Sequence, residues 1–437
     1  MRVINKFTVV ICLMILYVET FSQTVQAPYE VSVWPGFRSA AISFTFDDNT
    51  SNQLLVAIPL FDEFDYKATL FTVTNWSPNW NGLKQAAANG HEVASHTVTH
   101  PYLNQITEEQ QTTEQMDSYN AINTNIPNQS GQTFAYPYCV IGNKEITKQY
   151  YFGARGCQGF VEQKTPTDIM NISSIICGSE GSVKTVDNFK YYSDQAVTKN
   201  GLCVYLLHGV DNDGGWSSTE SPVIRGHLEY LKANENKFWV ETFGNIIRYI
   251  KERNSATVIE TSVTENLITI MVTDTLDNAI FNYPVTIRRP LPDDWLGCDV
   301  AQNGSAVTAK FIDINSIRYV MFDAVPDAGE IQLVKNNTVG VNDNDWIRNP
   351  ASFALEQNYP NPFNPSTVIS YQLSVFSKVQ LEVYDLLGRE VATLVNEYKP
   401  AGTYEIEFDG SKLISGVYFY QLCAGDIIAT RKLMLMK

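Results

Sequence analysis

The sequence predicts an α/β domain followed by two all-β modules of the Ig-like sandwich class. Residues 28–253 alternate short apolar runs with helical patterns, residues 257–336 have mostly a two-residue periodicity, and residues 357–437 form a third, compact β segment. Alternation of strands and helices is typical of a parallel sheet, either open or closed into a barrel. Short runs of alternating polar and apolar residues between turns are typical of sandwich strands.

The first domain is expected to start with the apolar run AAISFTF and to alternate from there. Gly90 has the position of a helix C-terminal cap, and Thr107 and Gln110 form a capping-box pattern at the start of a polar helix. In chain order, the expected elements are strand Ala40–Phe46, helix Ser51–Phe64, strand Ala68–Thr74, helix Leu83–Ala88, strand His91–Ser95, a helix from the capping box to Asn125, strands Thr133–Tyr138, Tyr151–Arg155 and Leu202–Leu207, and helices 219–234 and 241–253.

The second domain, residues 257–336, is expected to be a β-sandwich module whose sequence carries no motif that assigns it a function. Its expected strands are Thr257–Ser262, Leu267–Thr273, Val285–Arg288, Ala306–Ile312, Arg318–Phe322 and Glu330–Val334. Residues 337–356 are polar and rich in Asn and Asp, which is typical of a linker.

The N-terminus has the pattern of a secretory signal over residues 1–22. Arg2 and Lys6 precede a twelve-residue apolar run, Phe7–Val18, which is short for a membrane span. An N-terminal anchor or a buried helix is the alternative. No other stretch is long and apolar enough to predict a stable membrane span.

Charge and cysteine content limit the partners and the compartment. The chain of 437 residues has 47 acidic and 31 basic residues, a formal net charge of -16, which disfavours nucleic acids and anionic membrane surfaces. There is no CxxC pair, so a thiolate zinc site is not expected. The four cysteines of the first domain can form two disulfides in an exported protein or remain free buried thiols, and their spacing does not decide between these.

Candidate metal ligands occur in two segments of the first domain. His96 and His100 lie four residues apart, and Pro101 disfavours helical geometry at His100, so a turn is expected there. The strand at 40–46 ends in Asp47 and Asp48, at the end of the strand where sites of parallel α/β folds gather. Two imidazoles and one carboxylate leave an open position on a divalent metal, and the second carboxylate can reach the water there.

A third segment places His208 directly after the apolar strand 202–207. Each of the three segments also has a plainer interpretation. The histidine pair can be surface polar residues, the two aspartates can cap a turn before the next helix, and His208 can be a satisfied histidine at a strand end.

Taken in this order, the segments resemble the polysaccharide deacetylase family, the NodB-homology group of carbohydrate esterases. The resemblance covers about residues 38–253. Thr45–Asp48 (TFDD) corresponds to the first family motif, His96–His100 (HTVTH) to the second, Ala135–Tyr138 (AYPY) to the third, which normally reads RxPY, and Leu207–His208 to the last.

The resemblance implies a distorted (β/α) barrel that hydrolyses N- or O-acetyl groups on a glycan with the help of a metal. It implies that Asp47 is the general base, which takes a proton from the metal-bound water, and that His208 is the general acid. The backbone N–H of Tyr138 would help to stabilise the oxyanion. The implied ligands of the metal, usually zinc, are Asp48, His96 and His100.

Two positions depart from the family pattern. Asn49 follows the aspartate pair where the family commonly has glycine, and Ala135 replaces the arginine that would orient Asp47 and lower its pKa. We hypothesise that Arg155 supplies this cation from the next strand. An ordinary surface ion pair is the alternative for Arg155, and a separation beyond about 8 Å from Asp47 would exclude the hypothesis.

Aromatic side chains near these motifs are candidates for stacking on sugar rings. Tyr102 and Tyr138 adjoin site motifs, and Trp216 follows a Gly-rich turn, residues 211–215, that can form a lip over the site or a solvated loop. Trp76 and Trp80 are further candidates, although most aromatic residues pack in cores.

The C-terminal segment, about residues 356–437, closely resembles the type IX secretion C-terminal sorting domain. The resemblance rests on YPNPFNPST at Tyr359–Thr367, VQLEVYDLLGREVATL at Val379–Leu394, AGTYEIEFDGSKLISGVYFYQL at Ala401–Leu422 and the terminal RKLMLMK. It implies recognition by outer-membrane secretion machinery and delivery, through the periplasm and the outer membrane, into the medium or onto the cell surface. An ordinary Ig-like sandwich is the alternative.

The sequence therefore predicts an exported, metal-dependent carbohydrate deacetylase whose partner is an acetylated polysaccharide. The main alternative is a catalytically weak family member that binds glycans at the cell surface, because Ala135 replaces a motif arginine. A third hypothesis is a surface adhesion protein in which the β modules carry the function.

Overall fold

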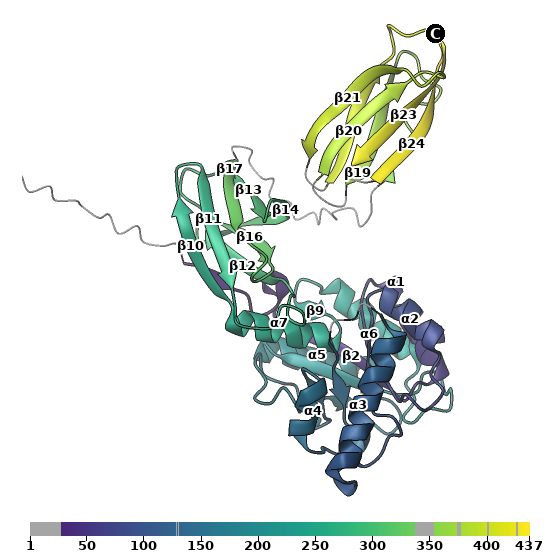
Figure 1. Cartoon of the computed structure of the whole chain (residues 1–437), viewed down its shortest axis with the longest axis vertical. Helices are drawn as coiled ribbons and strands as arrows, with labels where there is room; N and C mark the ends of the chain where they lie inside the picture. Colours follow the sequence, from purple (N-terminus) through teal and green to yellow (C-terminus); the bar gives the residue numbers. More distant parts are fainter. Residues whose placement is uncertain are drawn as a thin grey trace, which may run out of the picture.

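The structure is a computed structural model that describes residues 28–127, 129, 131–336, 354–373, 377–399, 402–424 and 427–437. The expected signal peptide at 1–22 and most of the expected linker at 337–356 lie outside the described residues. Figure 1 shows the α/β domain in purple to teal, followed by a green and a yellow β module. None of the helices described in this structure is both long and apolar enough to span a bilayer.

The α/β domain is built on a sheet of parallel strand pairs in the order β6-β5-β4-β3-β2-β8-β7. A further short strand, β9, pairs with the first residues of β2. The strands are β2 Ala40–Asp47, β3 Thr69–Thr72, β4 Glu92–Ser95, β5 Phe134–Ala135, β6 Ala154–Arg155, β7 Ile175–Ile176, β8 Leu202–Leu207 and β9 Phe238–Val240.

The sheet closes into a distorted barrel, as expected. The segment before β7 bonds to β6 through a parallel bridge between Ile172 and Arg155, and Gly156 donates its N–H to the Ile172 carbonyl at 2.8 Å. A few residues later the same segment becomes β7 and pairs with β8. One short segment thus joins the two ends of the sheet and places the ends of β2, β4, β6 and β8 around a common centre.

The helices lie outside this sheet, and α3 starts at the residue that the sequence predicts. The capping box of Thr107 and Gln110 opens α3, which confirms that expectation. The expected helix over 51–64 is a π-helical turn at Gln53–Ala57 that continues into α1, and α4 and α5 were not predicted because they are polar and carry few apolar repeats. The helices are α1 Ile58–Glu63, α2 Trp80–Ala88, α3 Glu108–Asn125, α4 Lys144–Tyr150, α5 Val186–Lys199, α6 Ser221–Ala233 and α7 Phe243–Ser255.

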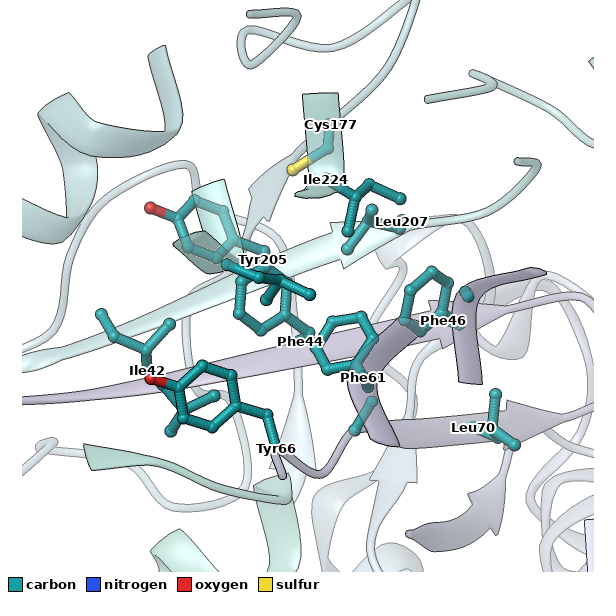
Figure 2. Packing of buried hydrophobic residues seen from close by; sticks show 14 of the residues in the cluster. Ile42, Phe44, Phe46, Phe61, Tyr66, Leu70, Cys177, Tyr205, Leu207 and Ile224 are labelled. Atoms are coloured by element: carbon teal, nitrogen blue, oxygen red, sulfur yellow. The ribbon is translucent and has the colours of Figure 1, made fainter. Parts of the chain in front are cut away.

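Side chains of β2 alternate between the outside and the inside of the barrel. Ile42, Phe44 and Phe46 point outward into an apolar core under the helices, where the Phe44 ring lies 4.9 Å from Phe61 and 5.2 Å from Tyr205 (Figure 2). Because successive Cβ atoms of a strand face opposite sides, the odd-numbered residues of β2 face the barrel interior. The last of them is Asp47.

The middle β module is a sandwich of two antiparallel sheets with the orders β1-β12-β16-β15 and β10-β11-β17-β13-β14. Five of the six expected strands are present. The expected strand Ala306–Ile312 is instead two strands, β14 and β15, which break at Thr308 and belong to different sheets, and β13 was not predicted. Its strands are β10 Thr257–Val263, β11 Leu267–Thr273, β12 Val285–Pro290, β13 Gly297–Gln302, β14 Ser305–Val307, β15 Ala309–Ile314, β16 Ile317–Ala324 and β17 Ile331–Asn336. The short strand β1, Glu30–Val31, precedes the barrel in the sequence but pairs with β12 of this sandwich.

The barrel and the middle sandwich share one apolar core. Buried residues of α7, among them Phe243 and Ile247, belong to the same cluster as Val285, Phe322 and Leu333 of the sandwich. At this contact, the buried carboxyl group of Glu252 on α7 accepts a hydrogen bond of 3.3 Å from the N–H of Tyr283.

The C-terminal module is a separate sandwich with its own apolar core. Its sheets have the orders β18-β19-β22 and β21-β20-β23-β24. Its strands are β18 Ala354–Leu355, β19 Ser366–Leu373, β20 Ser377–Tyr384, β21 Glu390–Lys399, β22 Gly402–Asp409, β23 Gly416–Ala424 and β24 Ile427–Leu435.

Candidate active site

The aspartate pair lies where β2 ends and the chain turns. Asp48 and Asn49 both have positive φ, 76° and 56°. The chain therefore turns directly after Asp47, and the carboxylates of Asp47 and Asp48 point in different directions. Asn49 holds this turn because its side chain donates to the Val73 carbonyl at 2.7 Å and accepts from the Val73 N–H at 3.1 Å. Asparagine tolerates the left-handed region, so it serves here where the family commonly has glycine.

The histidine pair follows β4 in a turn, as predicted from Pro101. Thr97 and His100 have positive φ, 69° and 62°, and the His100 N–H is held by the Thr97 hydroxyl at 2.9 Å. The Nε2 atoms of His96 and His100 face each other at 3.1 Å. The Oδ1 atom of Asp48 lies 3.7 Å from the first of these atoms and 3.5 Å from the second.

This cluster fits a divalent metal. The ligand atoms of Asp48, His96 and His100 all lie within 4.8 Å of one another. Nδ1 of His96 is 2.8 Å from the Ala135 carbonyl, so Nδ1 carries the proton and Nε2 presents a lone pair. Two histidine nitrogens that bind one tetrahedral zinc ion, each at about 2.0–2.1 Å, would lie ~3.3 Å apart, which is close to the distance between the Nε2 atoms of His96 and His100.

Arg155 lies beside Asp47, well inside the 8 Å limit. A guanidinium nitrogen is 2.5 Å from Oδ2 of Asp47, and a second donates to the Ser174 hydroxyl at 3.2 Å. The guanidinium also lies over the Phe71 ring, 5.1 Å from its centroid, and the side chain is 2% exposed. Burial raises the pKa of Asp47, but the charge and hydrogen bond of Arg155, together with His96 and His208, outweigh burial and hold this pKa below its usual value.

His208 completes the cluster at the end of β8. Its Nε2 atom is 3.8 Å from Oδ2 of Asp48. Burial lowers the pKa of the imidazole to about 4, so the ring is neutral at pH 7. Burial, together with the charge of Asp47, raises the pKa of Asp48 to about 7, and a cation bound beside Asp48 would favour its ionised form.

Gln53 is a site residue that the sequence analysis missed. Its buried side-chain amide donates to the carbonyl of Asp47 at 2.5 Å and to that of His208 at 3.1 Å. It thereby links the ends of β2 and β8. In the sequence, the role of Gln53 is indicated only by a polar residue at a position of the expected helix that faces the core.

The cluster opens into a cavity of about 570 Å³ with an aromatic rim. Tyr102 and Tyr138 stack with centroids 3.9 Å apart, Trp216 lies 4.7 Å from the His208 ring, and Trp76 lies 5.1 Å from the His100 ring. These four side chains are 43–50% exposed. Trp80 is not part of this rim because it packs on the apolar core.

A disulfide joins Cys139 and Cys157 beside the cavity. Cys177 and Cys203 are free buried thiols, so the first domain has one bridge and not two. Cys298 is also a free buried thiol, and Cys423 is free and partly exposed.

Comparison with known proteins gives two family matches. Residues 36–155 match the model of the polysaccharide deacetylase family, and residues 357–436 match the secretion system C-terminal sorting domain. A gellan lyase from Bacillus sp. is 29% identical over 328 residues, which make up 70% of this chain and 13% of that protein. The chain thus spans about an eighth of the length of this curated relative.

Solved structures of deacetylases also resemble the chain. The Xyl-CE4 domain of a multidomain xylanase from the hindgut metagenome of Trinervitermes trinervoides matches with a TM-score of 0.36 and 19% identity, over 47% of this chain and 89% of that one. The Streptococcus pyogenes deacetylase PplD, in complex with acetate, matches with a TM-score of 0.28 and 24% identity, over 30% of this chain and 62% of that one.

The deacetylase match contains the first three motifs and ends before Leu207–His208, and the sorting-domain match covers the expected C-terminal segment. The sorting domain indicates delivery to the cell surface or the extracellular space. The chain therefore contains a polysaccharide deacetylase domain of the NodB-homology type and a type IX secretion C-terminal sorting domain.

Proposed function

We propose that this protein is a secreted, metal-dependent deacetylase that removes N- or O-acetyl groups from a polysaccharide. The observation that carries the proposal is the convergence of five side chains on one cavity within a domain of the deacetylase family. They are Asp47, Asp48, His96, His100 and His208.

Asp48, His96 and His100 are the residues that would hold the metal. Their nitrogen and carboxylate donors suit zinc. When bound, such an ion lowers the pKa of a coordinated water and polarises a carbonyl group.

Asp47 is assigned as the general base. Arg155 keeps its carboxylate ionised by binding Oδ2, while Oδ1 is buried and has no hydrogen-bond partner among the described residues. This second oxygen is available to take the proton of an attacking water. The ion pair with Arg155 therefore supports the assignment despite the alanine at position 135.

Tyr138 and His208 are assigned to the two ends of the scissile bond. Tyr138 lines the cavity, and we assign its backbone N–H to the oxyanion. His208 is neutral at rest, so as general acid it must gain a proton during turnover. It then passes that proton to the departing amine or alkoxide.

The rim aromatics are assigned to sugar binding. Tyr102, Tyr138 and Trp216 present exposed rings at the cavity mouth, and flat aromatic faces suit the C–H faces of sugars. The partners that follow from this proposal are an acetylated polysaccharide at the cavity and the type IX secretion machinery at the sorting domain.

An acetate-release panel tests the proposal. Zinc-loaded protein is incubated with acetylated xylan, chitin oligomers, peptidoglycan and an acetylated exopolysaccharide, and Asp47→Asn is the matched control. We expect acetate from at least one glycan with the wild type, and at least a hundredfold less with the variant. If the wild type releases none while both proteins bind glycan equally, the protein is a glycan-binding family member instead.

A further inference from the structure

The Cys139–Cys157 disulfide joins two segments that each carry a candidate site residue. Its Cα atoms are 5.6 Å apart, and the two cysteines are separated by 18 positions in the sequence. Cys139 directly follows Tyr138, and Cys157 lies two residues after Arg155. The bond therefore links the turn after β5 to the end of β6.

The turn on one side of the bond has an unfavourable backbone conformation. Tyr138 and Cys139 have φ values of 53° and 62°, two consecutive non-glycine residues in the left-handed region. Such residues are strained and persist only where the surroundings fix them. Two backbone hydrogen bonds hold this turn, from the Cys139 N–H to the Tyr136 carbonyl and from the Val140 N–H to the Pro137 carbonyl.

The segment that carries Cys157 follows a very short strand, β6. β6 has only two residues, and Arg155 is the second of them. The guanidinium of Arg155 nevertheless contacts Asp47 in the barrel interior. It does so because position 135, where the family motif has arginine, is alanine in this chain. A covalent link two residues further along restricts the movement of this strand end.

We propose that Cys139 and Cys157 are positioning residues of the active site. Their bond fixes the backbone of Tyr138 and the strand end of Arg155 relative to each other, and this geometry is lost on reduction. The proposal rests on the proposed function, because it assigns the two cysteines to the same reaction. It makes the enzyme dependent on the oxidising conditions outside the cytoplasm.

The first test measures turnover after reduction. Reduction adds two electrons and two protons to give two thiols, and a phosphine supplies the electrons while it takes up the oxygen of water. On the panel glycan that the wild type deacetylates fastest, we expect the phosphine to lower kcat at least tenfold and to change KM less than threefold. Cys139→Ser/Cys157→Ser should have the reduced value of kcat without any phosphine.

The double variant also serves as the control for side effects. It should not respond to the phosphine, which separates loss of this bond from removal of metal. Cys177→Ala/Cys203→Ala, which removes two free buried thiols of the barrel, should respond as the wild type does. In an Arg155→Gln background the phosphine should have a smaller effect, because one of the two positioned groups is already absent.

A second readout does not need activity. Hydrogen exchange, followed by mass spectrometry, should become faster on reduction in peptides covering 134–143 and 152–160, and remain unchanged in α3. Unchanged exchange in both peptides, or unchanged kcat in the reduced wild type, would overturn the proposal. If the wild type releases no acetate from any glycan, the proposed function fails, whereas the exchange result still decides whether the bond positions the two segments.

Discussion

Arg155 and Asp47 lie on strands that are not neighbours in the sheet, yet their side chains meet at 2.5 Å inside the barrel. β6 is separated from β2 by β5, β4 and β3, so the contact crosses the interior. The guanidinium holds the pKa of Asp47 down although burial raises it. One arginine thus supplies, from a different strand, the charge that the family motif places at position 135.

Replacement of Arg155 by glutamine should impair the base. Without the cation, burial raises the pKa of Asp47, and the carboxylate loses its fixed orientation. We expect acetate release to fall about a hundredfold, which corresponds to ~2.7 kcal/mol of transition-state stabilisation. Arg155→Lys should retain part of the activity. Activity of Arg155→Gln within twofold of the wild type would remove Arg155 from the site.

His96→Ala should abolish stoichiometric metal binding. The substitution removes one of two converging imidazole nitrogens, and the remaining ligand set is too small to retain zinc. Metal content after dialysis, measured by mass spectrometry of the elements, checks this. His91→Ala is the matched control, because His91 is buried beside Asp62 at 3.0 Å and lies outside the cluster. Equal zinc in both variants would contradict the ligand assignment.

Trp216→Ala and Tyr102→Ala should weaken glycan binding more than chemistry. Both rings are about half exposed at the cavity mouth. An aromatic ring that packs on the C–H face of a sugar stabilises the bound glycan without contacting the reacting bond. We expect KM for the best panel glycan to rise threefold to tenfold, with kcat changed less than threefold. Tyr191→Ala, an exposed aromatic on α5, should leave both constants unchanged.

Glu252→Gln should stabilise the protein in a pH-dependent manner. Burial and the neighbouring Asp274 raise the pKa of Glu252 to about 8 from the ordinary 4.5. Between these values the folded state holds a proton that the unfolded state has lost, so this group's contribution to stability is present below pH 4.5 and is lost as pH rises through 8.

Glutamine cannot ionise, so the variant avoids this loss and should be more stable than the wild type by ~1–3 kcal/mol near pH 8, with little difference at pH 4.5. Thermal melting at both pH values measures the effect. The exposed Glu229→Gln serves as the control. A pH-independent difference between Glu252→Gln and the wild type would contradict the proton assignment.

The parts of the fold that the sequence predicted have strong local signals. The strands β2 and β8 are long and apolar, α3 has a complete capping box, and the strand-end aspartates and histidines mark the site. β6 lies within the expected strand Tyr151–Arg155, whereas β7 was not predicted, because it has only two residues and its pairing comes from barrel closure.

Other features depend on contacts between distant residues. Arg155 could be suggested as a substitute cation, but only the fold shows that it crosses the interior to Asp47. The pairing of Cys139 with Cys157 could not be chosen from spacing among four cysteines. Gln53 escaped notice because its role is to bind two backbone carbonyls on strands far apart in the sequence.

Because the barrel and the middle sandwich share one apolar core, we expect the two to be inherited together in evolution. A recombination event that cut between α7 and β10 would leave apolar side chains of both halves facing water. It would also leave β1, which precedes the barrel in the sequence, without β12, the sandwich strand to which it pairs. Exchange of catalytic domains among related chains is therefore expected to occur at residues 337–353, so that the sandwich travels with the barrel while the sorting domain can be replaced.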